Sequence, residues 1–231
     1  MPKTMKSVVE FAQEVLGIQL YELQAVALEG IATHALSVLP CGRRGGKSLI
    51  SACWAVYDAC MRNLGGYQRN GELRYILVVA GSVTQARALF RTIQDMFQNP
   101  MLSPMVLGDI TLDEIRLVNN VILKVVPCSD RTTRGLPAST VIFEEMASYQ
   151  DTDGHQSGEN VYRALSPSVA QFGRDGRIIA AAAPIGQRGV FFRLYEQALL
   201  RKDAYVLHCP TWELNPSIDR AFLEREREAD P

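Results

Sequence analysis

The sequence predicts an α/β domain whose central sheet is mostly parallel and is covered by helices on both faces. Short apolar runs that are typical of strands alternate along the chain with longer segments whose apolar residues recur at helical spacing. The runs at 74–80 and 177–183 are almost continuously apolar, as expected for parallel strands buried on both faces. A glycine-rich turn at 41–46 joins a strand-like run directly to a helix-like segment, which is a further sign of this class.

The composition is that of a globular protein with a substantial core. The chain has 231 residues, of which 47% are hydrophobic, and this length suits one large domain or one and a half. Lysine and arginine number 24 against 25 acidic residues, so the formal net charge is -1. Such a small charge gives no overall attraction to nucleic acid or to an anionic membrane, and any nucleic-acid contact must therefore be local.

Cysteine usage and apolar patterning bear on the compartment. The five cysteines are odd in number and lack paired metal-ligand spacing, which favours free thiols in a reducing compartment and predicts no disulfide. Glu10 and Glu14 interrupt the first apolar stretch, so we expect no signal peptide. The longest apolar run, at 178–185, is far too short to span a bilayer, and we expect no membrane partner.

Each expected element follows from its periodicity and its flanking residues. Gly17 suits the C-cap of a first helix, Asn119 and Asn120 suit the tight turn of a hairpin, and Pro167 should end or interrupt a later helix. The expected order is helices at 8–16 and 20–32, strand 35–39, a helix from near 47 to 60, strand 74–80, helix 83–97, hairpin 114–126, strand 140–143, helix 160–170, strand 177–183, helix 189–200, strand 205–209, an extended segment 210–216 and a charged helix 219–230.

The turn Cys41-Gly42-Arg43-Arg44-Gly45-Gly46-Lys47-Ser48 has the strand and helix context of a phosphate-binding loop. Backbone N–H groups of such a turn point at an oxyanion, Lys47 would reach the outer phosphates, and the Ser48 hydroxyl would hold Mg²⁺. The match to the Walker A pattern is imperfect, because Cys41 stands where the first glycine should be. The alternative is a glycine-rich turn with incidental basic residues. The nucleotide-binding residues expected here are Gly42, Arg43, Arg44, Gly45, Gly46, Lys47 and Ser48.

Two carboxylates, Glu144 and Glu145, follow the apolar strand at 140–143. In such a pair the first carboxylate usually holds Mg²⁺ through water and the second polarises the attacking water. Adjacent strand residues point to opposite faces, so the two can have different roles. A Walker B strand normally has aspartate first, and the alternative is a pair of solvated acids at a strand end.

Gln24 lies in the helix that precedes the phosphate loop. Many nucleic-acid-dependent ATPases place a glutamine there, because its amide supplies one donor and one acceptor for the edge of adenine. The alternative is an exposed helical glutamine.

Several signals occur in one order along the chain. They are Gln24, the arginine-rich phosphate loop, Arg134-Gly135 before the acidic strand, a strand ending in Ala183-Pro184, and Thr211-Trp212-Glu213-Leu214-Asn215-Pro216. In this order they resemble the N-terminal ATPase domain of tailed-phage large terminases, from about residue 20 to the end of the chain. The resemblance implies a P-loop NTPase fold of the RecA/ASCE type, with ATP and Mg²⁺ as cofactors.

The resemblance also implies a function. Large terminases are motors that pump double-stranded DNA into a procapsid as a homo-oligomeric ring on the viral portal protein, with a small terminase subunit as a further partner. Such a protein acts in the host cytoplasm and is not part of the mature virion. In isolation we expect a monomer, because the sequence shows no heptads and no long amphipathic interface.

Carried over by position, the resemblance assigns individual roles. Lys47 and Ser48 bind phosphate and Mg²⁺, Glu144 binds the metal, and Glu145 is the catalytic base. Arg43 matches an arginine that senses the γ-phosphate, and Arg134 matches a finger donated to a neighbouring subunit, although Arg131 is close enough to be confused with it. An arginine suits both tasks because its planar, permanently charged fork can grip a phosphoryl group at two points. The segment Ala181-Ala182-Ala183-Pro184 occupies the coupling-motif position but lacks the hydroxyl residues usual there.

The expected domain organisation is an ATPase domain at 1–210 and a linker at 211–231. In the family this linker leads to a nuclease domain, and we expect the chain to be a fragment that lacks it. Two other functions stay open: a superfamily-two helicase-like or other ring translocase ATPase, and a nucleotide-dependent assembly switch without turnover. A helicase would need a second RecA-like domain, and a pure switch would have no need of Glu145 as a base.

Overall fold

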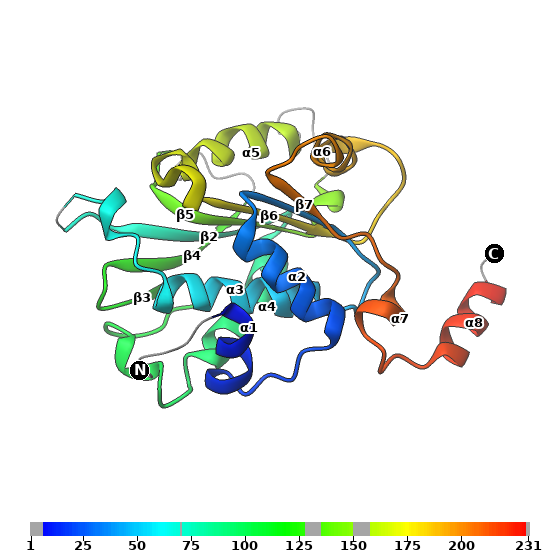
Figure 1. The fold of residues 1–231 in the computed structure, drawn as a ribbon, viewed down its shortest axis with the longest axis horizontal. Helices are drawn as coiled ribbons and strands as arrows, with labels where there is room; N and C mark the ends of the chain where they lie inside the picture. Colours follow the sequence, from blue (N-terminus) through cyan, green and yellow to red (C-terminus); the bar gives the residue numbers. More distant parts are fainter. Residues whose placement is uncertain (1–6, 70, 128–134, 150–157, 230–231) are drawn as a thin grey trace.

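The computed structural model of the protein describes residues 7–69, 71–127, 135–149 and 158–229. Within these ranges the strands form one seven-stranded sheet in the order β3-β4-β2-β5-β6-β1-β7 (Figure 1). All neighbouring pairs are parallel except the antiparallel hairpin of β3 and β4. The strands are β1 (Leu36–Pro40), β2 (Arg74–Ala80), β3 (Glu114–Arg116), β4 (Val121–Pro127), β5 (Ala138–Glu144), β6 (Arg177–Ala182) and β7 (Ala204–Val206).

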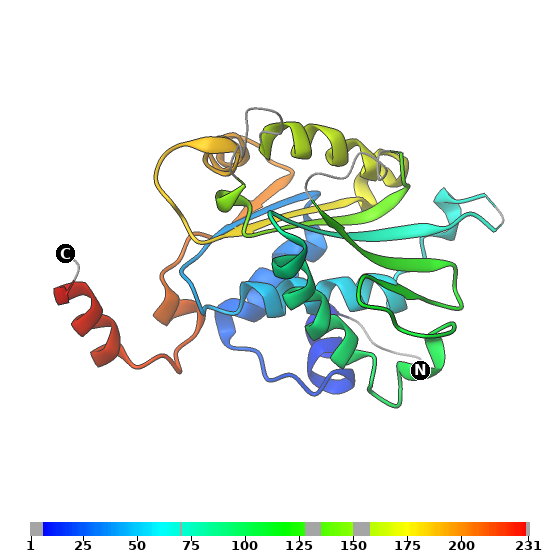
Figure 2. The same ribbon diagram turned by 180° about the vertical axis from the view of Figure 1, so that it is seen from behind.

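Helices cover both faces of this sheet, as predicted. Figures 1 and 2 show one layer on each side. One layer consists of α1 (Val8–Glu10) with the π-helical turn η1 (Phe11–Val15), α2 (Glu22–Thr33), α3 (Lys47–Met61) and α4 (Val83–Met96). The other consists of η4 (Met146–Ser148), α5 (Gly158–Leu165), η5 (Ser166–Asp175) and α6 (Gly189–Leu199). Two short 3₁₀ turns, η2 (Gly65–Tyr67) and η3 (Ser103–Met105), lie in connecting segments.

The continuous apolar runs are explained by a separate hydrophobic core on each face. In β2, Ile76 and Val78 pack into the core under α3 and α4, whereas Leu77 and Val79 pack into the core under α5 and α6. Successive strand residues point to opposite faces, so a strand between two helical layers favours apolar residues at successive positions.

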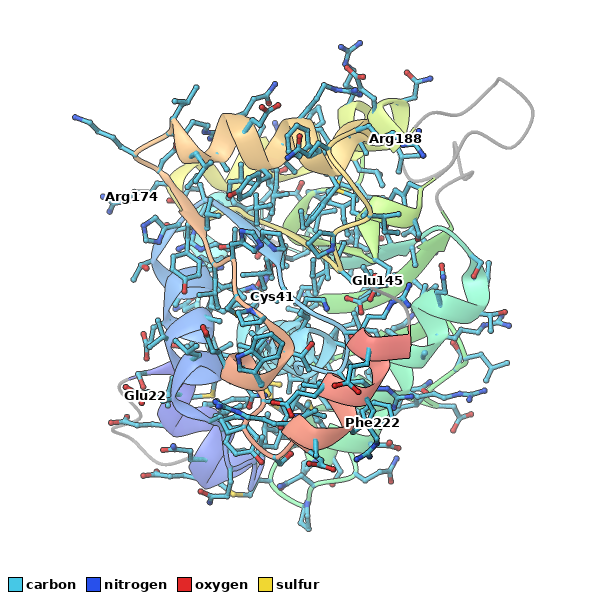
Figure 3. The ribbon with its side chains drawn as sticks, turned by 90° about the vertical axis from the view of Figure 1, so that its right-hand side faces the viewer. Glu22, Cys41, Glu145, Arg174, Arg188 and Phe222 are labelled. Carbon is cyan, nitrogen blue, oxygen red and sulfur yellow. The ribbon has the colours of Figure 1, made fainter. Side chains whose placement is uncertain are left out.

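The parallel strands β1, β5 and β6 are neighbours and end at one edge of the sheet. Pro40 at the end of β1 is in register with Ala182, and Glu144 at the end of β5 is in register with Ala181. Figure 3 looks onto this edge and shows Cys41 and Glu145 near its centre. Loops that follow the carboxyl ends of parallel strands are where such sheets bind ligands.

One local prediction is wrong. The segment 210–216, expected to be extended, contains a short helix, α7 (Thr211–Leu214), in which Asn215 N donates to Thr211 O at 2.8 Å. Leu214 is fully buried in the core under α3. A single helical turn has little stability of its own, so this tertiary contact is what forms it.

The chain then continues into α8 (Arg220–Ala229), which stands away from the body in both Figure 1 and Figure 2. In the part of the chain that the structure describes, no helix has the length and apolar character needed to cross a bilayer. Four cysteines (Cys41, Cys53, Cys60 and Cys209) are free thiols, and Cys128 lies outside the described residues.

Candidate functional site

The phosphate loop leaves β1 without the glycine that the Walker A pattern requires. Cys41 still pairs with Cys209 in a parallel bridge, and its backbone does not have a positive φ, so a side chain is tolerated there. Burial raises the pKa of the Cys41 thiol to about 12, which makes it a neutral group at the loop entrance. Further on, Gly46 has a φ of 98° as the N-cap of α3, a backbone conformation that favours glycine.

Lys47 is the first residue of α3 and lies inside the loop. Its side chain is only 5% exposed, and Nζ donates hydrogen bonds to Cys41 O at 3.0 Å and to Gly42 O at 2.9 Å. The ammonium group is therefore held by the loop's own carbonyls. A phosphate oxygen that replaced these carbonyls would meet a charged donor already positioned in the loop.

Arg43 and Arg44 lie at the tip of the loop with exposed side chains. Arg44 has a φ of 63°, a left-handed conformation that costs a residue other than glycine about 1–2 kcal/mol. Surrounding contacts must hold such a backbone in place.

Ser48 and Glu144, the two residues predicted to bind a metal ion, are in contact. Ser48 Oγ donates a hydrogen bond to Glu144 Oε1, which joins the first turn of α3 to the end of β5. Glu144 is 6% exposed, and its Oε2 has no partner among the described residues. Burial raises the pKa of this carboxyl group and the nearby charge of Glu145 adds to the effect, while the Ser48 hydroxyl opposes it.

This donor set fits Mg²⁺. The ion prefers hard oxygen ligands and keeps several waters, so one hydroxyl and one carboxylate beside a phosphate are sufficient protein ligands. A buried carboxylate oxygen without a partner is costly unless a ligand or cation completes it. Ser48 and Glu144 would hold the ion.

Glu145 points to a different neighbour. It has a left-handed backbone with a φ of 50°, and its Oε2 accepts a hydrogen bond from Ala183 N at 3.4 Å. The carboxylate therefore touches the segment 181–184 through the main chain. This contact requires no hydroxyl side chain, which is the feature that the segment lacks.

Gln24 contacts the phosphate loop directly. Its Nε2 donates to Gly45 O at 2.9 Å, its Oε1 accepts from Tyr21 N at 3.1 Å, and the residue is only 4% exposed. The alternative of an exposed helical glutamine is wrong, because the loop packs over α2. That the amide reads adenine stays a prediction.

Arg131 and Arg134 lie outside the described residues.

Two further contacts to the phosphate loop were not predicted from the sequence, although they come from the segment 211–216, which carries part of the resemblance. Thr211 Oγ1 donates to Arg43 O at 2.9 Å, and Asn215 Nδ2 donates to Arg44 O at 3.0 Å. The signal was the spacing of threonine and asparagine in Thr-Trp-x-x-Asn-Pro, which places the two side chains one helical turn apart.

The sheet, the loop and the first turn of α3 together define a P-loop domain of the α/β class. The chain belongs to the family described as "Uncharacterized protein MJ0330, N-terminal P-loop domain", which matches residues 2–231. No curated protein matches the chain.

Solved structures of phage packaging proteins have the same fold. The large terminase ATPase domain of Thermus phage P74-26 is similar with a TM-score of 0.72 and 18% identity, covering 98% of this chain and 94% of that chain. The large terminase of bacteriophage HK97 has a TM-score of 0.72 and 16% identity, covering 96% of this chain and 50% of that one. The N-terminal domain of the DNA packaging ATPase of bacteriophage phi29 has a TM-score of 0.51 and 15% identity over 81% of this chain and 94% of that chain.

The predicted fold class and the predicted resemblance to large terminase ATPase domains are both confirmed. The chain spans about half the length of the HK97 large terminase. At identities this low, the structural likeness shows the shared fold alone.

Proposed function

We propose that this domain hydrolyses ATP to drive the translocation of double-stranded viral DNA into a procapsid. The observation that carries the proposal is the contact between Ser48 on the phosphate loop helix and Glu144 at the end of β5, with Glu145 beside it. This contact supports the proposal because the residues that would bind phosphate, hold the metal and act as the base lie at one edge of the sheet. A large terminase of the same fold from a thermophilic bacteriophage was solved with ADP and with ATP-gamma-S.

In this proposal the chain's own residues divide the work. Loop N–H groups would hold the phosphates, and Lys47 would exchange its two carbonyl partners for oxygens of the β- and γ-phosphates. Arg43 would contact the γ-phosphate. Glu145 would orient the attacking water and accept its proton. Mg²⁺, held by Ser48 and Glu144, would supply charge neutralisation on the phosphates.

The test is DNA-stimulated ATP hydrolysis. We expect Lys47→Ala to reduce turnover about 10²- to 10³-fold or more, because it removes the one buried ammonium group of the loop. Lys202→Ala removes an exposed lysine and is the control. Glu145→Gln should still bind ATP but not cut it. Wild-type turnover in Lys47→Ala would overturn the proposal, and normal turnover in Glu145→Gln but not in Glu144→Gln would show that the two carboxylates have exchanged roles.

Arg134 would be donated in trans within a homo-oligomeric ring on the portal. An arginine finger is worth about 10³- to 10⁵-fold in rate, so the isolated monomer should hydrolyse ATP slowly. Arg134→Ala should leave this slow rate unchanged and remove the acceleration on assembly. Mixing Arg134→Ala with Glu145→Gln subunits should partly restore activity, whereas a defect already complete in dilute monomer would show that Arg134 acts in cis.

The proposed partners are double-stranded DNA, the portal protein and the small terminase subunit, in the host cytoplasm. The ATPase domain, expected at 1–210, extends through α7, because Leu214 is buried in its core. The remainder of the segment expected as a linker at 211–231 would lead towards a nuclease domain. A helicase-like or other ring translocase would show DNA-dependent turnover without a requirement for portal, and an assembly switch would bind nucleotide without turnover.

A further inference from the structure

Five consecutive carbonyl groups of the phosphate loop accept hydrogen bonds from side chains. The donors come from three elements that are far apart in the sequence. Lys47 donates to the carbonyls of Cys41 and Gly42, Thr211 to that of Arg43, Asn215 to that of Arg44, and Gln24 to that of Gly45.

This arrangement fixes where the loop's N–H groups point. In a trans peptide unit the C=O of one residue and the N–H of the next point in opposite directions. A carbonyl held towards α7 or α2 therefore turns the following N–H towards the other side of the loop. The carbonyls of Arg43 and Arg44, held by Thr211 and Asn215, set the N–H groups of Arg44 and Gly45. Successive N–H groups that converge in this way form an anion-binding concavity.

The loop and α7 fit each other closely. A Cβ at Gly42 would collide with Thr211 Oγ1, and a Cβ at Gly45 would come within 2.8 Å of Leu214 Cδ2. Leu214 is fully buried, which anchors α7 in this position. The approach of α7 therefore requires glycine at position 42, where a Cβ would also come within 2.7 Å of Thr211 N, and disfavours a larger residue at position 45.

We propose that Thr211 and Asn215 are positioning residues that preset the phosphate loop before nucleotide binds. Asn215 holds the carbonyl of Arg44, the one loop residue other than glycine with a left-handed backbone. Without this bond Arg44 would relax towards an ordinary backbone conformation, and the N–H of Gly45, which belongs to the same peptide unit as the Arg44 carbonyl, would leave the concavity. The proposal deepens the proposed function and rests on it for the identity of the anion as a nucleotide phosphate.

The first experiment needs no nucleotide. We expect backbone amide order parameters of residues 42–46 near about 0.85 in the wild type and below about 0.6 in Thr211→Val/Asn215→Leu, measured by NMR relaxation on the nucleotide-free protein. Thr211→Ser keeps the hydroxyl that donates to Arg43 O, so this variant should keep the order parameters closer to the wild-type values than Thr211→Val does. A merely structural role of α7 would lower the melting temperature and leave these order parameters at the wild-type level, which would overturn the proposal.

The second experiment measures ADP affinity in the presence of Mg²⁺. Loss of two hydrogen bonds that preorganise the loop should weaken binding about tenfold or more in the double variant. Thr33→Val is the matched control, because Thr33 Oγ1 donates to Glu29 O at 2.8 Å on an exposed helix end away from the loop. Equal affinity of the double variant and the control would also overturn the proposal.

The two experiments separate the two hypotheses. If the wild type binds no nucleotide, the proposed ATPase function fails, while the order parameters still decide whether Thr211 and Asn215 hold the loop. If the wild type binds ADP and the double variant binds it equally well with a rigid loop, only the positioning role fails.

Discussion

Two buried carboxylates connect α3 to β5, one at each end of the helix, and they differ in how many hydrogen-bond partners they have. Asp58, near the carboxyl end of α3, is fully buried and accepts hydrogen bonds from Arg74 at 2.6 Å, Ser139 at 2.8 Å and Thr140 at 2.6 Å. Glu144 bonds Ser48 at the amino end of the same helix and keeps one oxygen without a partner among the described residues.

The difference separates a carboxylate whose oxygens are paired within the fold from one that keeps an oxygen without a partner among the described residues. A buried ionised group is tolerated when its lone pairs are satisfied and a counter-charge is near, and Asp58 meets both conditions through Arg74. Glu144 meets neither condition fully, and burial raises its pKa. The Glu144 carboxylate, with its unpartnered oxygen Oε2, lies beside the phosphate loop, where the sequence predicted a metal ligand.

The largest expected effect is a loss of folding stability when the ion pair between Asp58 and Arg74 is broken. Asp58→Ala should lower the free energy of unfolding by about 3–5 kcal/mol, because it leaves the guanidinium of Arg74, 2% exposed, buried without its carboxylate. Denaturant unfolding at constant m-value measures it. Asp58→Leu/Arg74→Met, which removes both charges, should recover much of the loss, and a loss below about 1 kcal/mol in Asp58→Ala would break the comparison.

Glu144→Gln should behave in the opposite way. Without nucleotide and with EDTA, we expect the variant to be at least as stable as the wild type, because it removes an incompletely satisfied buried charge. Nucleotide binding that depends on Mg²⁺ should weaken at least about tenfold. A large loss of stability in Glu144→Gln would show that the carboxylate is a structural group like Asp58.

The pH dependence of this variant has a definite sign. In the unfolded chain a glutamate titrates near about pH 4.3, and in the folded protein burial raises the pKa of Glu144. The folded wild type therefore binds the proton more tightly, so this contribution to stability is full below about pH 4.3 and is lost as pH rises through the raised pKa. The stability of Glu144→Gln relative to the wild type should increase over that window in thermal melts.

The smallest effect is expected at an exposed ion pair, between Arg87 and Asp113. Arg87 donates to both oxygens of Asp113, at 2.7 Å and 2.8 Å, but the two side chains are 36% and 44% exposed. Asp113→Asn should therefore cost less than about 1 kcal/mol in denaturant unfolding. The hydrogen bond from Arg87 lowers the pKa of Asp113, so the small contribution is present near neutral pH and is lost as pH falls through that lowered pKa. A cost as large as that of Asp58→Ala would show that burial is not what separates the two pairs.

The local pattern of apolar and turn residues was sufficient to predict most of the helices and strands. The strand predicted at 74–80 is β2 with the same bounds, and the hairpin turn falls at Asn120 with a φ of 62°. These elements depend on the spacing of apolar residues and on the residue types in the turn, and both are local features that can be read from the sequence. The short helix α7 was missed because its stability comes from Leu214 in the core, and no local pattern records that burial.

The sequence by itself indicated which strands are buried on both faces, where the phosphate loop lies, and that Glu144 and Glu145 lie at the carboxyl end of the strand β5. The tertiary structure decided what surrounds them. The Thr211 to Arg43 contact joins residues 168 positions apart, and the Asp58 to Thr140 contact joins residues 82 positions apart. Secondary structure depends on neighbours within a turn or two of the chain, whereas these bonds depend on the packing of whole layers, so only the folded molecule shows which carbonyls are held and which carboxylate oxygen is left open.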